Sequence, residues 1–137
     1  MWWIYALLSA LFAALTAIFA KIGIKGVDTD LATAIRTVVI LLIAWAIVLY
    51  KGAEHGMGNL TKINWVFLVL SGCATGLSWI FYFKALQLGK VSQVAPVDKL
   101  SVAIAIVLSV IFLGEPLTLK SSVGAMLIIA GTLVLIF

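Results

Sequence analysis

Five long apolar stretches are the feature that most constrains the fold of this 137-residue chain. At about 1.5 Å per residue, a helix of roughly twenty residues spans the ~30 Å hydrocarbon layer of a bilayer. Barrel strands would be about half as long and would alternate apolar with polar residues. We therefore predict an all-α polytopic membrane protein with five transmembrane helices, at about residues 2–21, 31–50, 63–83, 94–113 and 119–137.

The composition agrees with a chain whose solvent is lipid. Hydrophobic residues make up 65% of the chain and charged residues 10%, whereas an ordinary soluble domain carries about 25% charged residues. The first apolar stretch has no charge over residues 2–20 and is longer than the h-region of a secretory signal. We expect it to be a retained first helix. The chain is predicted to be a single transmembrane domain over 1–137, located in the cell (cytoplasmic) membrane.

The charges are few and evenly divided. The net charge is +4, but the basic residues stand singly at helix ends and loops, so we expect no nucleic-acid partner. Five helices place the two chain ends on opposite sides of the bilayer. One side then holds Lys51, Lys62 and Lys120, and the other holds Lys21, Lys25 and Lys90, with Lys84 nearby. This balance gives almost no positive-inside bias. It indicates insertion in both orientations, although a weak signal from a small protein is the alternative.

The sequence contains no catalytic or metal-binding pattern. Cys73 is the one cysteine and lies inside an apolar stretch, and His55 stands alone in a polar loop. Neither has a second ligand or a catalytic partner at a suitable spacing. We expect no enzyme, no cofactor and no metal.

Arg36 lies about six residues into the second apolar stretch, roughly 9 Å along the helix at 1.5 Å per residue. Its long side chain could reach the headgroups. It could instead face inward and meet an anionic substrate or a carboxylate. Depth alone leaves both interpretations open.

Pro96, Asp98 and Lys99 stand near the start of the fourth stretch. Pro96 could open that helix, with Asp98 as a first-turn acid favoured by the helix dipole. Alternatively, the helix begins earlier, and Pro96 breaks it inside the membrane and frees backbone groups to line a cavity. Asp98 is too short to reach the headgroups and needs water or a cation, for which Lys84, Lys99 and Arg36 are the candidates.

Small and aromatic residues dominate the third stretch. Gly72 and Gly76 form a GxxxG pair there, and Gly124 and Gly131 stand seven apart in the last stretch. Such glycines permit close helix packing, although small side chains fit a cavity wall equally well. The third stretch ends in an aromatic group that includes Trp79 and Tyr82. This group is either an interfacial belt or a lining for an organic substrate.

Residues 81–135, FYFKALQLGKVSQVAPVDKLSVAIAIVLSVIFLGEPLTLKSSVGAMLIIAGTLVL, resemble the second part of an EamA-type repeat of the drug/metabolite transporter superfamily. The shared features are an aromatic helix end, a Lys/Ala/Leu turn, a proline near the next helix start, Leu-Gly-Glu, a Leu-Thr pair and a glycine-rich last helix. The segment LATAIRTVVILL, residues 31–42, is similar to the second helix of that family, including its arginine.

The resemblance implies one half of a ten-helix inverted-repeat transporter, as in the single-repeat bacterial and archaeal subgroup. It implies a membrane transporter, an exporter of a small organic metabolite that works by alternating access as an antiparallel homodimer or as a heterodimer with a similar chain. The substrate and translocation candidates are then Arg36, Trp79, Tyr82, Lys84, Pro96, Asp98 and Lys99. Asp98 is the titratable candidate if transport is proton-coupled. The alternatives are a non-transporting membrane subunit beside a partner protein, or a lipid-carrier flippase.

Overall fold

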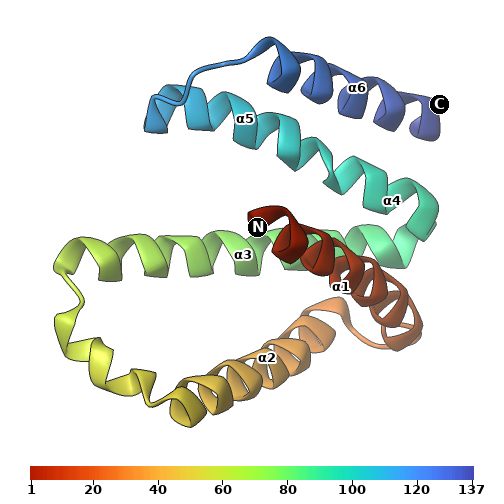
Figure 1. Cartoon of the computed structure of the whole chain (residues 1–137). Coiled ribbons are helices and arrows are strands. Elements are labelled where there is room, and N and C mark those ends of the chain that lie inside the picture. The colour runs from red at the N-terminus through yellow and green to blue at the C-terminus, as the bar shows by residue number, and fades with distance from the viewer. The chain divides into compact units, whose positions relative to one another are not determined.

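The computed structural model describes all 137 residues and contains helices and turns but no strand (Figure 1). The helices are α1 (Trp2–Gly23), α2 (Thr29–Lys51), the 3₁₀ helix η1 (Ala53–Asn59), α3 (Lys62–Leu88), α4 (Val91–Asp98), α5 (Leu100–Leu113) and α6 (Leu119–Ile136). Five helical segments are long and apolar enough to cross a membrane, because α4 and α5 together form the span Val91–Leu113. The prediction of an all-α protein with five spans is confirmed.

The chain divides into two compact units. One unit is Phe19–Gln87, which holds the end of α1, the helices α2 and η1, and almost all of α3. The other combines Met1–Ile18 with Leu88–Phe137, and so holds most of α1 together with α4, α5 and α6. The single domain expected over 1–137 stays a prediction.

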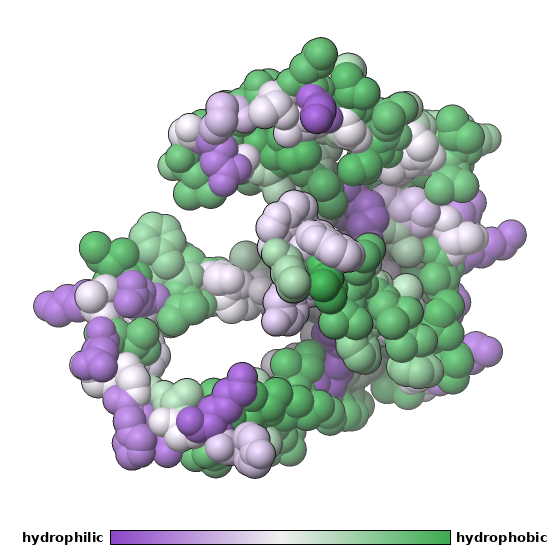
Figure 2. Space-filling view, viewed as in Figure 1, coloured by the Kyte–Doolittle hydropathy of each residue, from purple (hydrophilic) through white to green (hydrophobic).

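Apolar side chains cover the outside of the helices. The buried apolar residues are only Ala17, Ile24, Phe83, Leu86 and Ala103, while large hydrophobic residues are exposed along all five spans. Figure 2 shows hydrophobic residues over much of the visible helical surface, with hydrophilic residues along the η1 connection and in smaller patches elsewhere. In lipid such faces need no protein cover, because the surrounding tails are as apolar as the side chains.

The ends of α2 follow from local chemistry. Asp28 is extended, and its side-chain oxygen accepts hydrogen bonds from the backbone N–H groups of Asp30 and Leu31, each at 3.0 Å. An aspartate in this position satisfies N–H groups that have no partner within the helix. The helix ends at Gly52, whose φ of 64° lies in the left-handed region that favours glycine. Asp28 is therefore the residue that caps α2.

Two connections differ from the sequence-based expectation. The polar loop expected between the second and third spans contains the 3₁₀ helix η1. The polar junction expected over residues 84–93 is almost entirely helical, because α3 continues to Leu88 and α4 already begins at Val91. Only Gly89 and Lys90 separate the two helices, and Lys90 is extended (φ −79°, ψ 145°).

Pro96 is the sixth residue of α4 and lies inside the helix. The interpretation that Pro96 opens the fourth helix, with Asp98 in its first turn, is therefore wrong: Asp98 is the last residue of α4. The helix instead begins before the proline and is interrupted at Lys99 (φ −70°, ψ −9°). Backbone N–H groups bond three residues back on both sides of that point, from Lys99 to Pro96 and from Val102 to Lys99, each at 3.0 Å. The fourth span, Val91–Leu113, thus consists of two helices, α4 and α5, separated at Lys99.

Candidate functional site

Arg36 of α2 lies against the aromatic end of α3. Its Cζ atom is 3.3 Å from the centroid of the Trp79 ring and 5.7 Å from that of Phe83. Trp79 in turn makes edge contacts with Tyr82 and Phe83, at centroid distances of 5.4 and 5.6 Å. We call these four residues the Arg36–Trp79 cluster. The arginine therefore faces a neighbouring helix, where it meets aromatic rings and not a carboxylate. Its contact with a substrate stays a prediction.

The depths of the two residues explain why they meet. Arg36 is the eighth residue of α2, and Trp79 lies nine residues before Leu88, the end of α3. At 1.5 Å per residue these positions are about 10 and 13 Å from the helix ends. Consecutive spans run in opposite directions, so the start of α2 and the end of α3 lie on the same side of the bilayer. The two side chains are consequently at similar depth.

The rings offset only part of the cost of an arginine in this position. A cation–π contact contributes about 0.5–2 kcal/mol, whereas insertion scales give about 2.5–3.5 kcal/mol for an arginine at the centre of a membrane helix. The ion pairs of the chain do not include Arg36. A separation of 3.3 Å from the ring centroid is a stacking distance, so the guanidinium uses its face for the contact. Its N–H donors lie in the plane of the group and stay at its edge.

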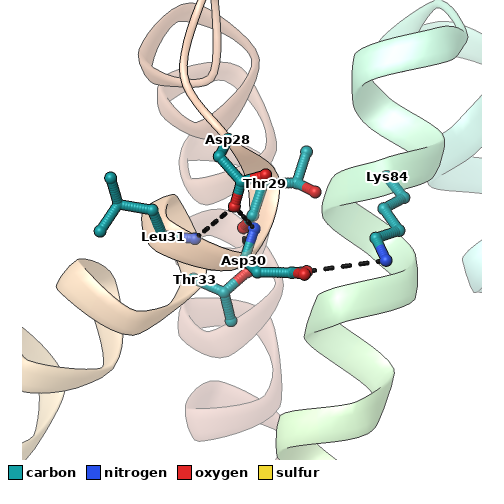
Figure 3. Close-up of polar contacts among 6 residues, drawn as sticks. All are labelled: Asp28, Thr29, Asp30, Leu31, Thr33 and Lys84. Atoms are coloured by element: carbon teal, nitrogen blue, oxygen red, sulfur yellow. Dashed lines mark hydrogen bonds and ion pairs between the residues drawn. The ribbon is translucent and has the colours of Figure 1, made fainter.

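Lys84 meets a carboxylate at the start of α2. Its Nζ lies 3.7 Å from Oδ1 of Asp30, and Figure 3 shows the two side chains reaching toward each other beside the Asp28 cap. The side chains are 51% and 59% exposed, so this is a surface ion pair of low energetic value. The predicted site residue Lys84 therefore has a partner within its own unit.

Two further hydrogen bonds join the turn between α1 and α2 to the end of α3. The side-chain amide of Gln87 donates to the Val27 carbonyl at 3.2 Å. The Lys21 ammonium donates to the carbonyl of Leu86, a residue that is fully buried. These contacts account for the length of α3, because they give its last turn tertiary partners beyond the apolar stretch.

In the other unit, Thr132 of α6 contacts the interrupted helix. Its Oγ1 lies 3.2 Å from the Pro96 carbonyl and 2.8 Å from the Ile128 carbonyl, and the residue is 3% exposed. Asp98 lies beside Lys99, with 3.4 Å between the carboxylate oxygen and Nζ. Lys99 is thus the cation next to Asp98, from among the predicted candidates.

The predicted site residues fall in different units. Arg36, Trp79, Tyr82 and Lys84 belong to Phe19–Gln87, and Pro96, Asp98 and Lys99 belong to the other unit. Within the first unit, Arg36, Trp79 and Tyr82 form one cluster, while Lys84 pairs separately with Asp30.

The glycines predicted to mediate packing have open surroundings. A Cβ atom added at Gly72, Gly76, Gly124 or Gly131 would meet nothing within 4 Å. Each of these four glycines therefore has room for a close approach at the position of a Cβ atom. Their role in helix packing stays a prediction.

Sequence reasoning missed three residues that contribute to these contacts: Asp30, Phe83 and Thr132. Asp30 could have been found, because an acid at the start of α2 and Lys84 at the end of α3 lie on the same side of the bilayer. Phe83 was visible only as part of the aromatic group. Thr132 gave no signal, because its contact depends on how α6 packs against α4.

Comparison with known proteins decides the class of protein. The model of the EamA-like transporter family matches residues 1–137. The chain belongs to this family. It is a multi-pass membrane protein of the short, single-repeat form and a membrane transporter by family. The resemblance read from the sequence is confirmed.

The relatives of this EamA-like chain differ in length. It is 50% identical over 134 residues to the "Uncharacterized transporter in cobO 3'region" of Sinorhizobium sp., covering 98% of this chain and 95% of that protein. It is 31% identical over 131 residues to the "Uncharacterized transporter YxxF" of Bacillus subtilis (strain 168), covering 93% of this chain but only 40% of that protein. The "Uncharacterized protein MJ1333.1" of Methanocaldococcus jannaschii is 35% identical over 69 residues, half of each chain. No solved structure matches.

Proposed function

We propose that this EamA-like chain exports a small organic metabolite across the cytoplasmic membrane by alternating access, as an antiparallel pair of copies. The observation that carries the proposal is the length of its relatives. The chain accounts for 95% of one transporter-named relative and for 40% of another. The longer relative has room for a second repeat of this size, and a second copy of the short chain would take that place.

The number of spans supports the inverted arrangement. Five spans bring the chain out on the side opposite to the one where it began. A second repeat joined directly to the first would start on that side and would be inverted. Two separate copies reproduce this pairing only if they insert in opposite orientations. The near balance of lysines on the two sides permits both orientations.

The open helix faces supply a surface for the second copy. Gly72 and Gly76 lie on α3 with no neighbour near them, and small residues let two helix backbones approach closely. Transporter repeats place their substrate site between the two halves, near discontinuous helices. The interrupted span at Pro96, with Asp98 and Lys99, is our candidate for that part of the pathway, and Asp98 is the candidate proton carrier.

Labelling of single cysteines tests the orientation. In a Cys73→Ser background, Val27→Cys probes the α1–α2 turn and His55→Cys probes η1, using a membrane-impermeant thiol reagent on intact and on permeabilised cells. We expect each position to be labelled partly in intact cells and fully after permeabilisation. Ala44→Cys, in the middle of the α2 span, is the control and should not react. Labelling of only one of the two positions in intact cells would show a single orientation. It would contradict the antiparallel homodimer and indicate a different partner chain.

Comparison of secreted metabolites tests transport itself. Cells that express the chain, cells that express it with the Asp98→Asn substitution, and cells without it are compared for compounds that accumulate in the medium. We expect one compound, or a few related ones, to rise only with the native chain, and Asp98→Asn to reduce that rise. Identical media from all three strains would contradict an exporter.

A further inference from the structure

Arg36 is a membrane cation with no counter-ion in its own unit. The unit contains three acidic residues, and each is engaged elsewhere. Asp28 accepts from the first backbone N–H groups of α2, Asp30 pairs with Lys84 at 3.7 Å, and Glu54 lies 3.6 Å from His55. The positive charge on Arg36 is therefore balanced only by the faces of aromatic rings.

The stacked position leaves the N–H donors of the guanidinium at the edge of the group, in its own plane. Contact at 3.3 Å from the Trp79 centroid holds the flat group against the ring. A planar guanidinium held in this way offers a pair of parallel N–H groups at its edge. A carboxylate accepts such a pair with two parallel hydrogen bonds, which adds geometric selectivity to the charge attraction.

We propose that the Arg36–Trp79 cluster binds the carboxylate of the transported compound, and that the substrate class is organic monocarboxylates with an apolar or aromatic body. This assignment rests on the transport function proposed above. It is carried by an arginine inside a membrane span that stacks on Trp79 and has no protein carboxylate beside it.

The rest of the cluster selects the body of the ligand. Arg36 lies against Trp79 and Phe83, and Tyr82 extends the aromatic surface through its edge contact with Trp79. Such a surface suits an apolar group attached to the carboxylate. One guanidinium balances one negative charge. A doubly charged phosphate monoester would keep an uncompensated charge away from water, and an amine would be repelled by Arg36, so both are disfavoured.

Fluorescence of Trp79 gives a direct binding test. Trp2, Trp3, Trp45 and Trp65 are replaced by Phe, so that Trp79 is the only indole, and the protein is placed in phosphatidylcholine nanodiscs. The probes are phenylacetate, its cationic analogue 2-phenylethylamine and its neutral analogue 2-phenylethanol. We expect saturable quenching by phenylacetate with a dissociation constant below about 10 mM, at least about tenfold tighter than for either analogue.

Substitutions at Arg36 show whether the guanidinium causes that preference. Arg36→Gln should weaken phenylacetate binding at least about tenfold. The affinity of Arg36→Lys should lie between those of Arg36→Gln and the unsubstituted chain, because lysine keeps the positive charge but lacks the planar fork of N–H donors. Lys51→Gln, which removes a cation at the far end of α2, is the matched control and should bind like the unsubstituted chain. Equilibrium binding of radiolabelled phenylacetate to the chain with all five tryptophans repeats the measurement if the single-tryptophan form does not fold.

Three results would overturn the assignment. One is equal binding of the amine and the carboxylate. Another is phenylacetate affinity that does not change in Arg36→Gln. The third is a change in Trp79 emission when phosphatidylglycerol is added but not when phenylacetate is added, provided that the change is lost in Arg36→Gln. The ligand of Arg36 would then be a lipid headgroup.

Failure of this assignment is distinguishable from failure of the transport function. If a metabolite is exported and Arg36→Gln leaves its export unchanged, the transport function is supported and the carboxylate site at Arg36 is rejected. If phenylacetate binds through Arg36 but no metabolite accumulates outside the cells, the carboxylate site is supported and export is rejected.

Discussion

The contact between Arg36 and Trp79 determines the polarity of the space between α2 and α3. It places a positive charge about 10 Å along a membrane helix and holds it on an aromatic face at 3.3 Å. Because the pair lies away from bulk water, the two side chains should depend on each other energetically more than a surface pair does.

A double-mutant cycle measures that dependence. We compare Arg36→Met, Trp79→Leu and the double variant by denaturant unfolding in mild detergent. The expected coupling is about 0.5–2 kcal/mol, the range of a cation–π contact that is partly or fully removed from water. The control cycle combines Arg36→Met with Trp65→Leu, which lies earlier on α3, and its coupling should be under about 0.5 kcal/mol. Equal coupling in the two cycles would mean that the stacked contact is not formed.

Asp28 and Asp30 are neighbouring acids with different roles. Asp28→Ala removes the oxygen that accepts from two N–H groups at the start of α2 and should lower the free energy of unfolding by about 1 kcal/mol. Asp30→Ala removes an exposed ion pair with Lys84 and should cost less, about 0–1 kcal/mol. Denaturant unfolding of both variants in the same detergent shows which substitution lowers the free energy of unfolding more. A larger decrease for Asp30→Ala than for Asp28→Ala would contradict these roles.

The sequence predicted three members of the Arg36–Trp79 cluster, Arg36, Trp79 and Tyr82, but not their contact. Charge inside an apolar stretch identified Arg36, and aromatic composition identified Trp79 and Tyr82. Their meeting depends on how α2 and α3 are rotated about their own axes. That rotation brings together pairs such as Lys84 with Asp30 and Gln87 with Val27, and a hydropathy pattern does not encode it.

Among the elements, the spans were predictable and two helix ends were not. Long apolar stretches determine the spans because lipid demands that length. The end of α3 and the start of α4 lie in polar sequence, where tertiary contacts decide how far a helix continues. Pro96 was ambiguous because a proline is tolerated both in a first helical turn and inside a membrane helix whose neighbours satisfy the backbone.

Thr132 of α6 makes a tertiary contact with the interrupted helix at the Pro96 carbonyl, which also accepts from the Lys99 N–H group. Thr132→Val removes the hydroxyl that reaches the Pro96 carbonyl at 3.2 Å and should lower the free energy of unfolding by about 1 kcal/mol. Hydrogen exchange should also increase at the amides of Lys99 and Val102, which bond around the interruption. Both changes are measured on the same detergent-solubilised protein.

Thr75→Val is the matched control for that substitution. The Thr75 hydroxyl bonds only within α3, to the Ser71 carbonyl at 2.8 Å. Its replacement should change stability by less than about 0.5 kcal/mol and should leave exchange at Lys99 unchanged. If the two threonines behave alike, the bond between α6 and the interrupted helix contributes nothing.

At the scale of the whole molecule, the chain has an odd number of spans and a near balance of lysines on the two sides of the bilayer. A chain with five spans cannot supply both an upright and an inverted repeat by itself. Family membership was readable from the fourth and fifth stretches, because their motifs are dense there. The partner was not readable in the same way, since faces open around Gly72 and Gly76 show only that a surface is available.

Biasing the orientation tests whether the pair must be antiparallel. Lys51→Gln with Lys62→Gln removes positive charge from one side, and Lys25→Gln with Lys90→Gln removes it from the other, so each double variant should insert in one orientation. These lysines are chosen because Lys21 and Lys84 contact other residues. With a different affinity tag on each variant, we expect dimers when the two are co-expressed and monomers when either is expressed alone, as measured by co-purification and size in detergent. The unsubstituted chain, carrying both tags, is the positive control. A double variant that dimerises when expressed alone would show that opposite orientations are not required, and the antiparallel pair would have to be abandoned.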